Sequence, residues 1–212
     1  MNVIPLSQAR EKYAVNRYDE KEGIIQPIYD YQPYAAIGQT SLIFFQVPNG
    51  QGGKTLADTN MTSAGQLPAP KSFLIQAIEI KFWSGVVPGT FGAQAAANYV
   101  NDVNAVLKSG HFQLFIGSKP YLDEAPIDVF PPTTRMCVDG ALSDMSTTGA
   151  DMQSMIQYAS GCGRTYTMSP LFLPSNQNFS VTLNWPTAVA LPSNVAGRIG
   201  VRLLGTLYRD SQ

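Results

Sequence analysis

Regular alternation of apolar and polar residues in the second half of the chain predicts β-strands. The runs HFQLFIG (111–117), NFSVTLNW (178–185) and RIGVRLLGTLYR (198–209) each have the period of two expected of a strand with one buried face. We expect the inward positions of these runs to form a core, and they are Phe112, Leu114, Ile116, Phe179, Val181, Leu183, Trp185, Ile199, Val201 and Leu203.

Three further runs have β character with a less regular pattern. SLIFFQV (41–47) is compact and apolar, and it ends at the turn-forming PNGQGG (48–53). FLIQAIEIKFW (73–83) is apolar at odd and even positions, which indicates a strand buried on much of both faces or one with a bulge. TYTMSPLFL (165–173) contains Pro170, so it suits a sheet edge or a bend.

Two stretches have the spacing of an amphipathic helix. AQAAANYVNDVNAVLKSG (93–110) repeats apolar residues at helical intervals and ends at Lys108 and Gly110, a typical C-terminal signal. DMQSMIQYASG (151–161) is a shorter candidate that stops at Gly161. Both lie between predicted strands, and a β-α-β alternation is absent. The chain is therefore predicted to be all-β, a single antiparallel β-sandwich of about six to eight strands with one or two short inserted helices.

The first 40 residues differ from the rest of the chain in their charge and proline pattern. A stretch rich in charges (10–22) precedes IIQPIYDYQPYAAIGQ (24–39), in which two prolines favour extended backbone. We therefore divide the chain into an N-terminal arm (1–40) and one sandwich domain (41–212). A length of 212 residues is sufficient for one well-filled core.

Three tyrosines of this arm have no local packing partner. Tyrosine is favoured at interface hot spots, so we expect these residues to anchor the arm on another subunit. An edge strand within its own domain explains the same residues equally well. The three are Tyr29, Tyr31 and Tyr34.

Composition favours assembly over binding to nucleic acid. Charged residues make up 14% of the chain, against about 25% in an average soluble domain. Interface centres are depleted in charge, so much of the surface is expected to contact other subunits; a monomer covered by neutral polar residues is the alternative. The net charge of -1 disfavours sequence-specific recognition of nucleic acid. No apolar run approaches the roughly 20 residues of a membrane helix, and the N-terminus lacks the apolar segment of a signal peptide, so we expect synthesis in a cytoplasm.

Motifs for catalysis are incomplete. NGQGGKT (49–55) follows a predicted strand, as a phosphate-binding loop would, but Pro48 stands where the first glycine is required and no helix pattern follows. Cys162 within SGCGRT (160–165) could act as a nucleophile only with His111, the single histidine, as its base. The spacing does not support this pair, so we expect a protein that is not an enzyme.

We expect no cofactor and no metal. One histidine is too few for a cupin-type metal centre. Asp123, Glu124 and Asp128 could hold calcium, but they lack the alternating acidic pattern of an EF-hand, and we interpret them as solvated. Cys137 and Cys162 do not form a disulfide framework; two reduced thiols and a single disulfide are both open.

The strand map, the extended arm and the low charge resemble those of viral jelly-roll coat proteins. SLIFFQVPNGQGGKTLADTNM (41–61) and KSGHFQLFIGSKPYLDEAPIDVFPP (108–132) are similar to structural proteins of bacteriophages, in particular the jelly-roll capsid proteins of tailless icosahedral phages. LPSNQNFSVTLNWP (173–186) fits too, as a proline-marked turn into an alternating strand. The resemblance covers most of residues 41–209 in pattern. Many such phages carry two jelly rolls per chain and this chain has room for one, so major, minor, vertex and decoration roles are all open.

This resemblance implies a virion structural protein, a self-assembling capsid subunit of the major or minor coat. Its implied partners are identical copies and other capsid proteins, without a small-molecule substrate, and its implied location is the virion after synthesis in the host cytoplasm. Basic residues of the arm could then make weak, non-specific contact with the packaged genome, although interleaved acidic residues cancel their charge. These residues are Arg10, Lys12, Arg17 and Lys21.

Two other functional classes compete with a capsid subunit. One is a β-sandwich module of a phage fibre, spike or decoration protein that binds carbohydrate or a receptor. Exposed aromatic residues would then stack on sugar rings, although core packing is the better interpretation of the two tryptophans, which lie in strand patterns. The candidates are Trp83, Trp185, Tyr121 and Tyr166. The other class is an enzyme, which would need a carboxylate pair or the pairing of Cys162 with His111.

Overall fold

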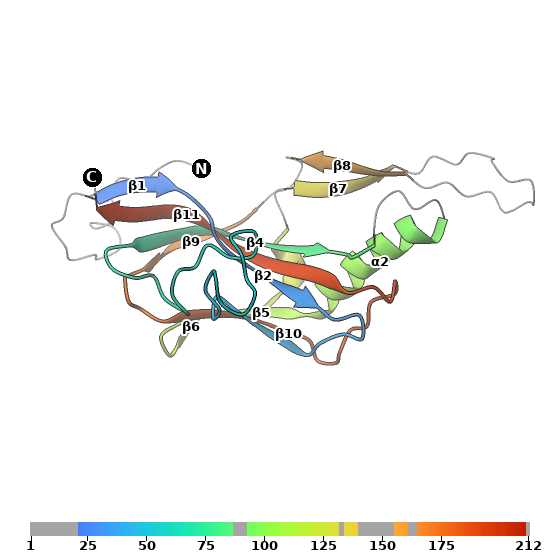
Figure 1. Cartoon of the computed structure of the whole chain (residues 1–212), viewed down its shortest axis with the longest axis horizontal. Helices are drawn as coiled ribbons and strands as arrows, with labels where there is room; N and C mark the ends of the chain where they lie inside the picture. The colour runs from blue at the N-terminus through green and yellow to red at the C-terminus, as the bar shows by residue number, and fades with distance from the viewer. Residues whose placement is uncertain (1–20, 87–92, 132–133, 140–154, 161–164, 211–212) are drawn as a thin grey trace, which may run out of the picture.

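The computed structural model of this chain describes residues 21–86, 93–131, 134–139, 155–160 and 165–210. Two antiparallel sheets pack face to face, so the predicted all-β sandwich is confirmed at the level of fold class (Figure 1). The first sheet contains β1 (Lys21–Ile25), β2 (Ile28–Tyr34), β4 (Ser72–Trp83), β9 (Tyr166–Leu173) and β11 (Gly197–Asp210). The second sheet contains β3 (Ser41–Phe44), β5 (His111–Ile116), β6 (Lys119–Pro126) and β10 (Phe179–Asn184).

The strand order is β1-β11-β4-β9 in the first sheet, where β2 also pairs with β11, and β3-β10-β5-β6 in the second. Two longer connections carry extra elements. Helix α2 (Ala93–Ser109) lies between β4 and β5, and a 3-10 turn, η1 (Ile127–Val129), follows β6. The connection from η1 to β9 contains a separate two-stranded sheet of β7 (Thr134–Asp139) and β8 (Met155–Ser160). No helix of the described residues is long and apolar enough to span a membrane.

β1 and β2 act as one interrupted strand along β11. Lys21 lies opposite Asp210 and Tyr34 lies opposite Gly197, in one unbroken antiparallel register. The break at Gln26 does not shift the ladder, because the Gln26 N–H still donates to the Gly205 carbonyl at 3.3 Å. Residues 21–34, which the sequence placed in the arm, are thus strands of the sandwich, as the edge-strand alternative expected.

β4 has a shift in its pairing and is buried on much of both faces, and its irregular sequence pattern indicated each of these features. Its pairing with β9 shifts between Ile75 and Ala77, which marks a bulge or irregularity. The side chains that join the core are Phe73 before this shift and Ile78 and Ile80 after it, so the parity of the inward positions changes there. Residues on the other face are largely buried as well.

The core lies between the two sheets and has the side chains that the alternation predicted. All of the inward positions named from the three regular runs are at most 8% exposed. Trp185 packs edge-on against Tyr34 at 5.4 Å between ring centroids, and its indole N–H donates to the Val106 carbonyl of α2 at 3.0 Å. Core packing of Trp185 is therefore confirmed, and this side chain also attaches α2 to the sandwich.

One of the two predicted helices is present. The prediction of the other is wrong for the residues of it that the structure describes. The helix predicted over residues 93–110 is α2. Residues 155–160 of the second candidate form β8, which pairs antiparallel with β7. A run this short gains too few internal hydrogen bonds to hold a helix alone, whereas the neighbouring strand provides partners for its backbone groups.

A pair of alanine substitutions in β10 tests the orientation of the second sheet. We expect Leu183→Ala to destabilise the fold by about 2–5 kcal/mol, because it leaves a cavity in the core. The neighbouring Thr182→Ala should change stability by only about 0.5 kcal/mol, since Thr182 points to the outer face. Urea unfolding measures both, and equal losses would contradict the assigned faces.

Candidate interaction surfaces

Within the described residues, no group of three or more His, Cys, Asp or Glu side chains converges as a metal site. Hydrogen-bonded polar side chains, some of them buried, lie together in three places instead. These are the edge of β2, the outer face of the second sheet, and the end of the sandwich where α2 lies.

The loop after β3 closes the outer edge of β2. The Tyr31 N–H donates to the Asp58 carbonyl at 2.8 Å, and the Tyr29 N–H donates to the Asn60 side-chain oxygen at 3.1 Å. In return, the Thr59 hydroxyl donates to the Tyr29 carbonyl at 3.0 Å. An open strand edge is a template for pairing with other chains, and these bonds remove that template along β2.

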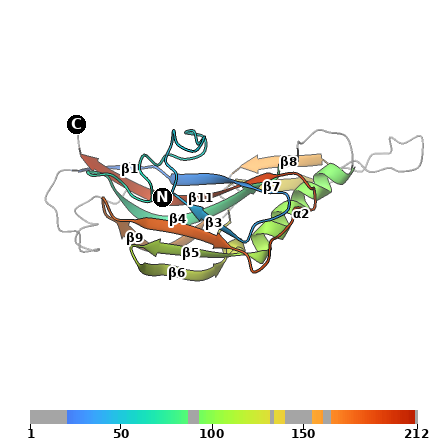
Figure 2. The same ribbon diagram turned by 60° about the horizontal axis from the view of Figure 1, so that its bottom comes forward.

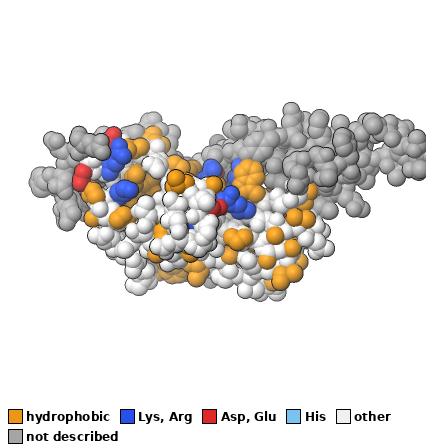
Figure 3. Space-filling view, in the orientation of Figure 1, with side chains coloured by type: hydrophobic (Ala, Val, Ile, Leu, Met, Phe, Trp, Pro, Cys, Tyr) orange, Lys and Arg blue, Asp and Glu red, His pale blue; other side chains and the backbone are white. Residues whose placement is uncertain are grey.

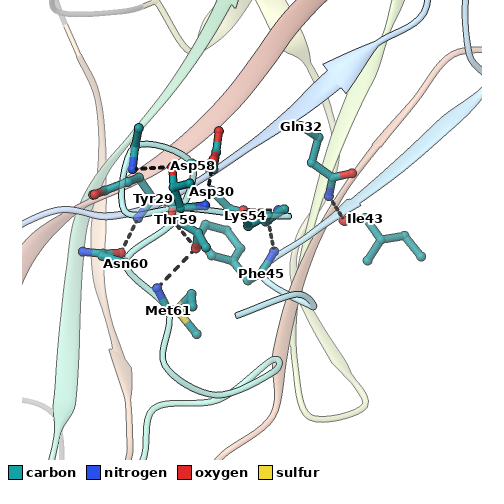
Figure 4. A network of polar contacts seen from close by, with 12 residues as sticks. Tyr29, Asp30, Gln32, Ile43, Phe45, Lys54, Asp58, Thr59, Asn60 and Met61 are labelled. Carbon is teal, nitrogen blue, oxygen red and sulfur yellow. Dashed lines mark hydrogen bonds and ion pairs between the residues drawn. The ribbon is translucent and has the colours of Figure 1, made fainter. Parts of the chain in front are cut away.

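A buried carboxylate holds this loop and the end of β3 together. Asp30 is fully buried on the inner side of β2, where it accepts hydrogen bonds from the Lys54 ammonium group and, at 2.7 Å, from the Phe45 N–H (Figure 4). Phe45 has a φ of 68°, a left-handed conformation that this bond helps to stabilise. Burial raises the pKa of Asp30, and the bonds from Lys54 and Phe45 lower it in part.

An arginine–tyrosine cluster lies on the outer face of β11. The Tyr31 ring covers Gly200, where an added Cβ would come within 2.1 Å of the ring. The Arg198 guanidinium stacks 4.5 Å from the Tyr31 ring centroid and pairs with Asp58 at 2.6 Å. Arg202 donates to the Tyr31 hydroxyl at 2.8 Å. Burial raises the pKa of Tyr31, and the charge of Arg202 lowers it in part.

The expected anchor tyrosines are largely used within their own chain. Tyr34 is fully buried and donates from its hydroxyl to the Val189 carbonyl at 2.8 Å. Tyr31 is 6% exposed, and Tyr29 is half-buried with its hydroxyl on the Leu56 carbonyl. Tyr31 and Tyr34 therefore pack within their own sandwich, because pairing with β11 gives them partners that the local sequence lacks. A contact of these tyrosines with another subunit stays a prediction.

Most of the other candidate residues lie outside the described part of the chain. Lys21 begins β1, whereas Arg10, Lys12 and Arg17 fall outside the described part of the chain. Cys162 also lies outside it, whereas His111 begins β5, so the expectation that these two residues do not form a catalytic pair stays a prediction.

A row of hydrogen-bonded polar side chains, here called the amide ladder, crosses the outer face of the second sheet. The Ser41 hydroxyl donates to Asn184 at 2.7 Å, the Asn184 amide donates to Gln113 at 3.1 Å, and the Gln113 amide donates to Asp123 at 2.9 Å. The row joins β3, β10, β5 and β6, and its first three members carry no charge. Tyr121 of β6 is 43% exposed.

The end of the sandwich near α2, here called the loop end, is tied together by a second buried carboxylate. Asp102 of α2 is fully buried and accepts hydrogen bonds from the Ser84 hydroxyl and, at 2.9 Å, from the Ser193 N–H. It therefore joins Ser84, just after β4, to the connection before β11, and Figure 2 shows that connection beside α2. Ile37 is 84% exposed in the neighbouring turn after β2.

The sequence interpretation missed both buried carboxylates. Each is a lone acidic residue at an inward position: Asp30 alternates with Ile28 in a strand, and Asp102 lies one position before Val103 in an amphipathic helix. An acidic residue at such a position is a signal for a paired carboxylate, because a buried charge requires partners.

No family model matches the chain, and searches of curated proteins and of solved structures also find no match.

Removing the cation from the buried pair should cost more than neutralising the carboxylate. Lys54→Met leaves the Asp30 charge buried and unpaired, so we expect a loss of about 3–5 kcal/mol at neutral pH. Asp30→Asn keeps an acceptor for the Phe45 N–H and should cost less. The double variant should cost less than the sum of the two single changes. Additive losses in urea unfolding would contradict a coupled pair.

The same variant should have a characteristic pH dependence. The folded-state pKa of Asp30 is raised, so the stability due to this group is fully present below its unfolded-state pKa and is lost as pH rises through the folded-state pKa. Removing Lys54 removes a bond that lowers the pKa. The deficit of Lys54→Met relative to the parent should therefore shrink as pH falls toward the acidic range, and a deficit that grows there would refute this assignment.

Proposed function

We propose that this chain is a virion structural protein, a self-assembling subunit of an icosahedral capsid in the major or minor coat, built on a single jelly roll. The observation that carries the proposal is the order of the strands. The two sheets contain five and four strands, and these count as eight because β1 and β2 form one interrupted strand along β11.

Numbered one to eight along the chain, these strands lie in the order 1-8-3-6 in the first sheet and 2-7-4-5 in the second. Such an order supports a jelly roll, in which two Greek keys wrap into a double sheet of eight strands. Viral capsid proteins and lectins are among the proteins that use this architecture. The β7–β8 sheet is an insertion between the fifth and sixth strands of this count.

The surface chemistry supports a role in assembly. Figure 3 shows a described surface that is mostly uncharged on this face, with basic side chains at the left end and near the middle and a few acidic ones beside them. The polar groups of the amide ladder already bond to one another, so a neighbouring subunit can cover them at a lower desolvation cost. Closed symmetry then repeats the same contacts around a shell.

The proposal includes the expected partners and location. The partners are identical copies and other capsid proteins, with no substrate, no cofactor and no catalysis by this chain. The location is the virion, after synthesis in the host cytoplasm. Weak contact of Arg10, Lys12, Arg17 and Lys21 with a packaged genome stays a prediction.

Light scattering after size exclusion, followed by negative-stain microscopy, tests this proposal. We expect regular capsomers, sheets or shells from the parent protein. Ile37→Asp should reduce them while leaving the subunit folded, because it adds a charge to an exposed apolar position at the loop end. Leu56→Asp, at an exposed position on the loop beside β2, is the matched control and should assemble normally. A monomer at every concentration would contradict the capsid role.

A carbohydrate-binding module of a fibre, spike or decoration protein is the second candidate. The amide ladder, close to the exposed Tyr121 on the same sheet, favours it, because amides can bond to sugar hydroxyls while an aromatic ring stacks on the sugar. On a glycan array, such a module should bind neutral glycans and lose about two- to tenfold in affinity with Tyr121→Ala. An array without bound glycans would remove this candidate.

A further inference from the structure

The outer edges of the two sheets are protected in several ways. The loop after β3 covers β2, as described above. β6 contains Pro120 and Pro126, and β9 contains Pro170. At β3, the Gln32 side-chain amide donates to the Ile43 carbonyl. Prolines and covering segments are among the means by which proteins prevent unwanted pairing at strand edges.

β1 has none of these protections within the described residues. It is the terminal strand of its sheet, it pairs with β11 on one side, and its sequence, KEGII, lacks proline. No described segment pairs with its other side. Figure 1 shows β1 at the outer margin of the sheet, and Ile25 is 47% exposed.

The register identifies the backbone groups that are open. The Gln26 N–H bonds to β11, so the even-numbered residues of this strand direct their N–H and C=O groups toward β11. The odd-numbered residues direct theirs away. Tyr29 and Tyr31 follow this rule, since the covering loop bonds to them from the outside. Within the described residues, the open backbone groups of β1 are therefore those of Lys21, Gly23 and Ile25, and the last two lie near the middle of the open edge.

We propose that this edge pairs with β1 of a second copy of the chain, antiparallel across a two-fold axis, so that the first sheets of two subunits become continuous. With Ile24 on the axis, Gly23 of each copy lies opposite Ile25 of the other. Residues opposite one another in this way exchange both hydrogen bonds, so the N–H and C=O groups of both residues are satisfied. The inference rests on the proposed function and names one contact of that assembly.

Charge and size favour a second copy in this orientation. Antiparallel pairing places Glu22 opposite Gln26 of the other copy. Parallel pairing in register would place Glu22 opposite Glu22 and Lys21 opposite Lys21, and like charges directly opposite are destabilising. Gly23 has no side chain to hinder the approach of the second strand. The same patch then serves both subunits, as a two-fold interface requires.

Ile25→Pro in the full chain tests the pairing directly. The Ile25 N–H points away from β11, so proline there removes a bond to the second copy while leaving the bonds to β11 in place. Sedimentation over a concentration series should show self-association of the parent and an association constant about 5- to 100-fold lower for Ile25→Pro, since one donor per copy is lost. Ile25→Ala keeps the backbone N–H, so its association constant should fall much less.

Thermal unfolding at a concentration where both variants are monomers shows whether they are folded, and equal midpoints for Ile25→Pro and Ile25→Ala are expected there. A parent chain that stays monomeric at every concentration would refute the pairing. So would an association constant unchanged by Ile25→Pro. If particles form and Ile25→Pro assembles as the parent does, this result refutes the β1 pairing and supports the capsid role. Dimers sensitive to Ile25→Pro but without particles would support the pairing and contradict the capsid role.

Discussion

The pairing of β11 along both of its sides is the constraint on which the rest of the structure depends. β1 and β2 follow one side in a single register, and β4 follows the other side with one shift. This ladder directs Ile199, Val201 and Leu203 into the core and Arg198 and Arg202 to the outer face. The same register determines which backbone groups at the sheet margin are bonded and which are open.

Two buried carboxylates connect the irregular segments to this framework. Asp30 joins β2 to the end of β3 and to Lys54 in the loop, and Asp102 joins α2 to two connections at the loop end. Loops carry few apolar contacts of their own, so a buried acceptor with several donors can position them more firmly than surface bonds. The loop beside β2 and the segments at the loop end are therefore held in place by hydrogen bonds to buried carboxylates.

Local sequence patterns were sufficient to predict a strand and its buried side chains wherever one face of that strand meets the core. The regular alternation in β5, β10 and β11 identified the buried side chains because a strand has a fixed period of two. Residues 93–110 were recognised as a helix because their apolar spacing and C-terminal signal agree. Residues 155–160 were misread as helical, because a short run has the propensity for either state and the neighbouring strand decides between them.

The sequence by itself therefore determined the fold class, the core residues of the regular strands and the low surface charge. Only the tertiary structure decided that Tyr31 packs on Gly200, that Asp30 meets Lys54, and that the amide ladder crosses four strands. The physical reason is that these contacts join residues far apart in the chain, and strand order rather than local pattern brings them together. A tyrosine without a neighbour in sequence has the same local pattern whether its partner is another subunit or a glycine 169 positions away (Tyr31 to Gly200).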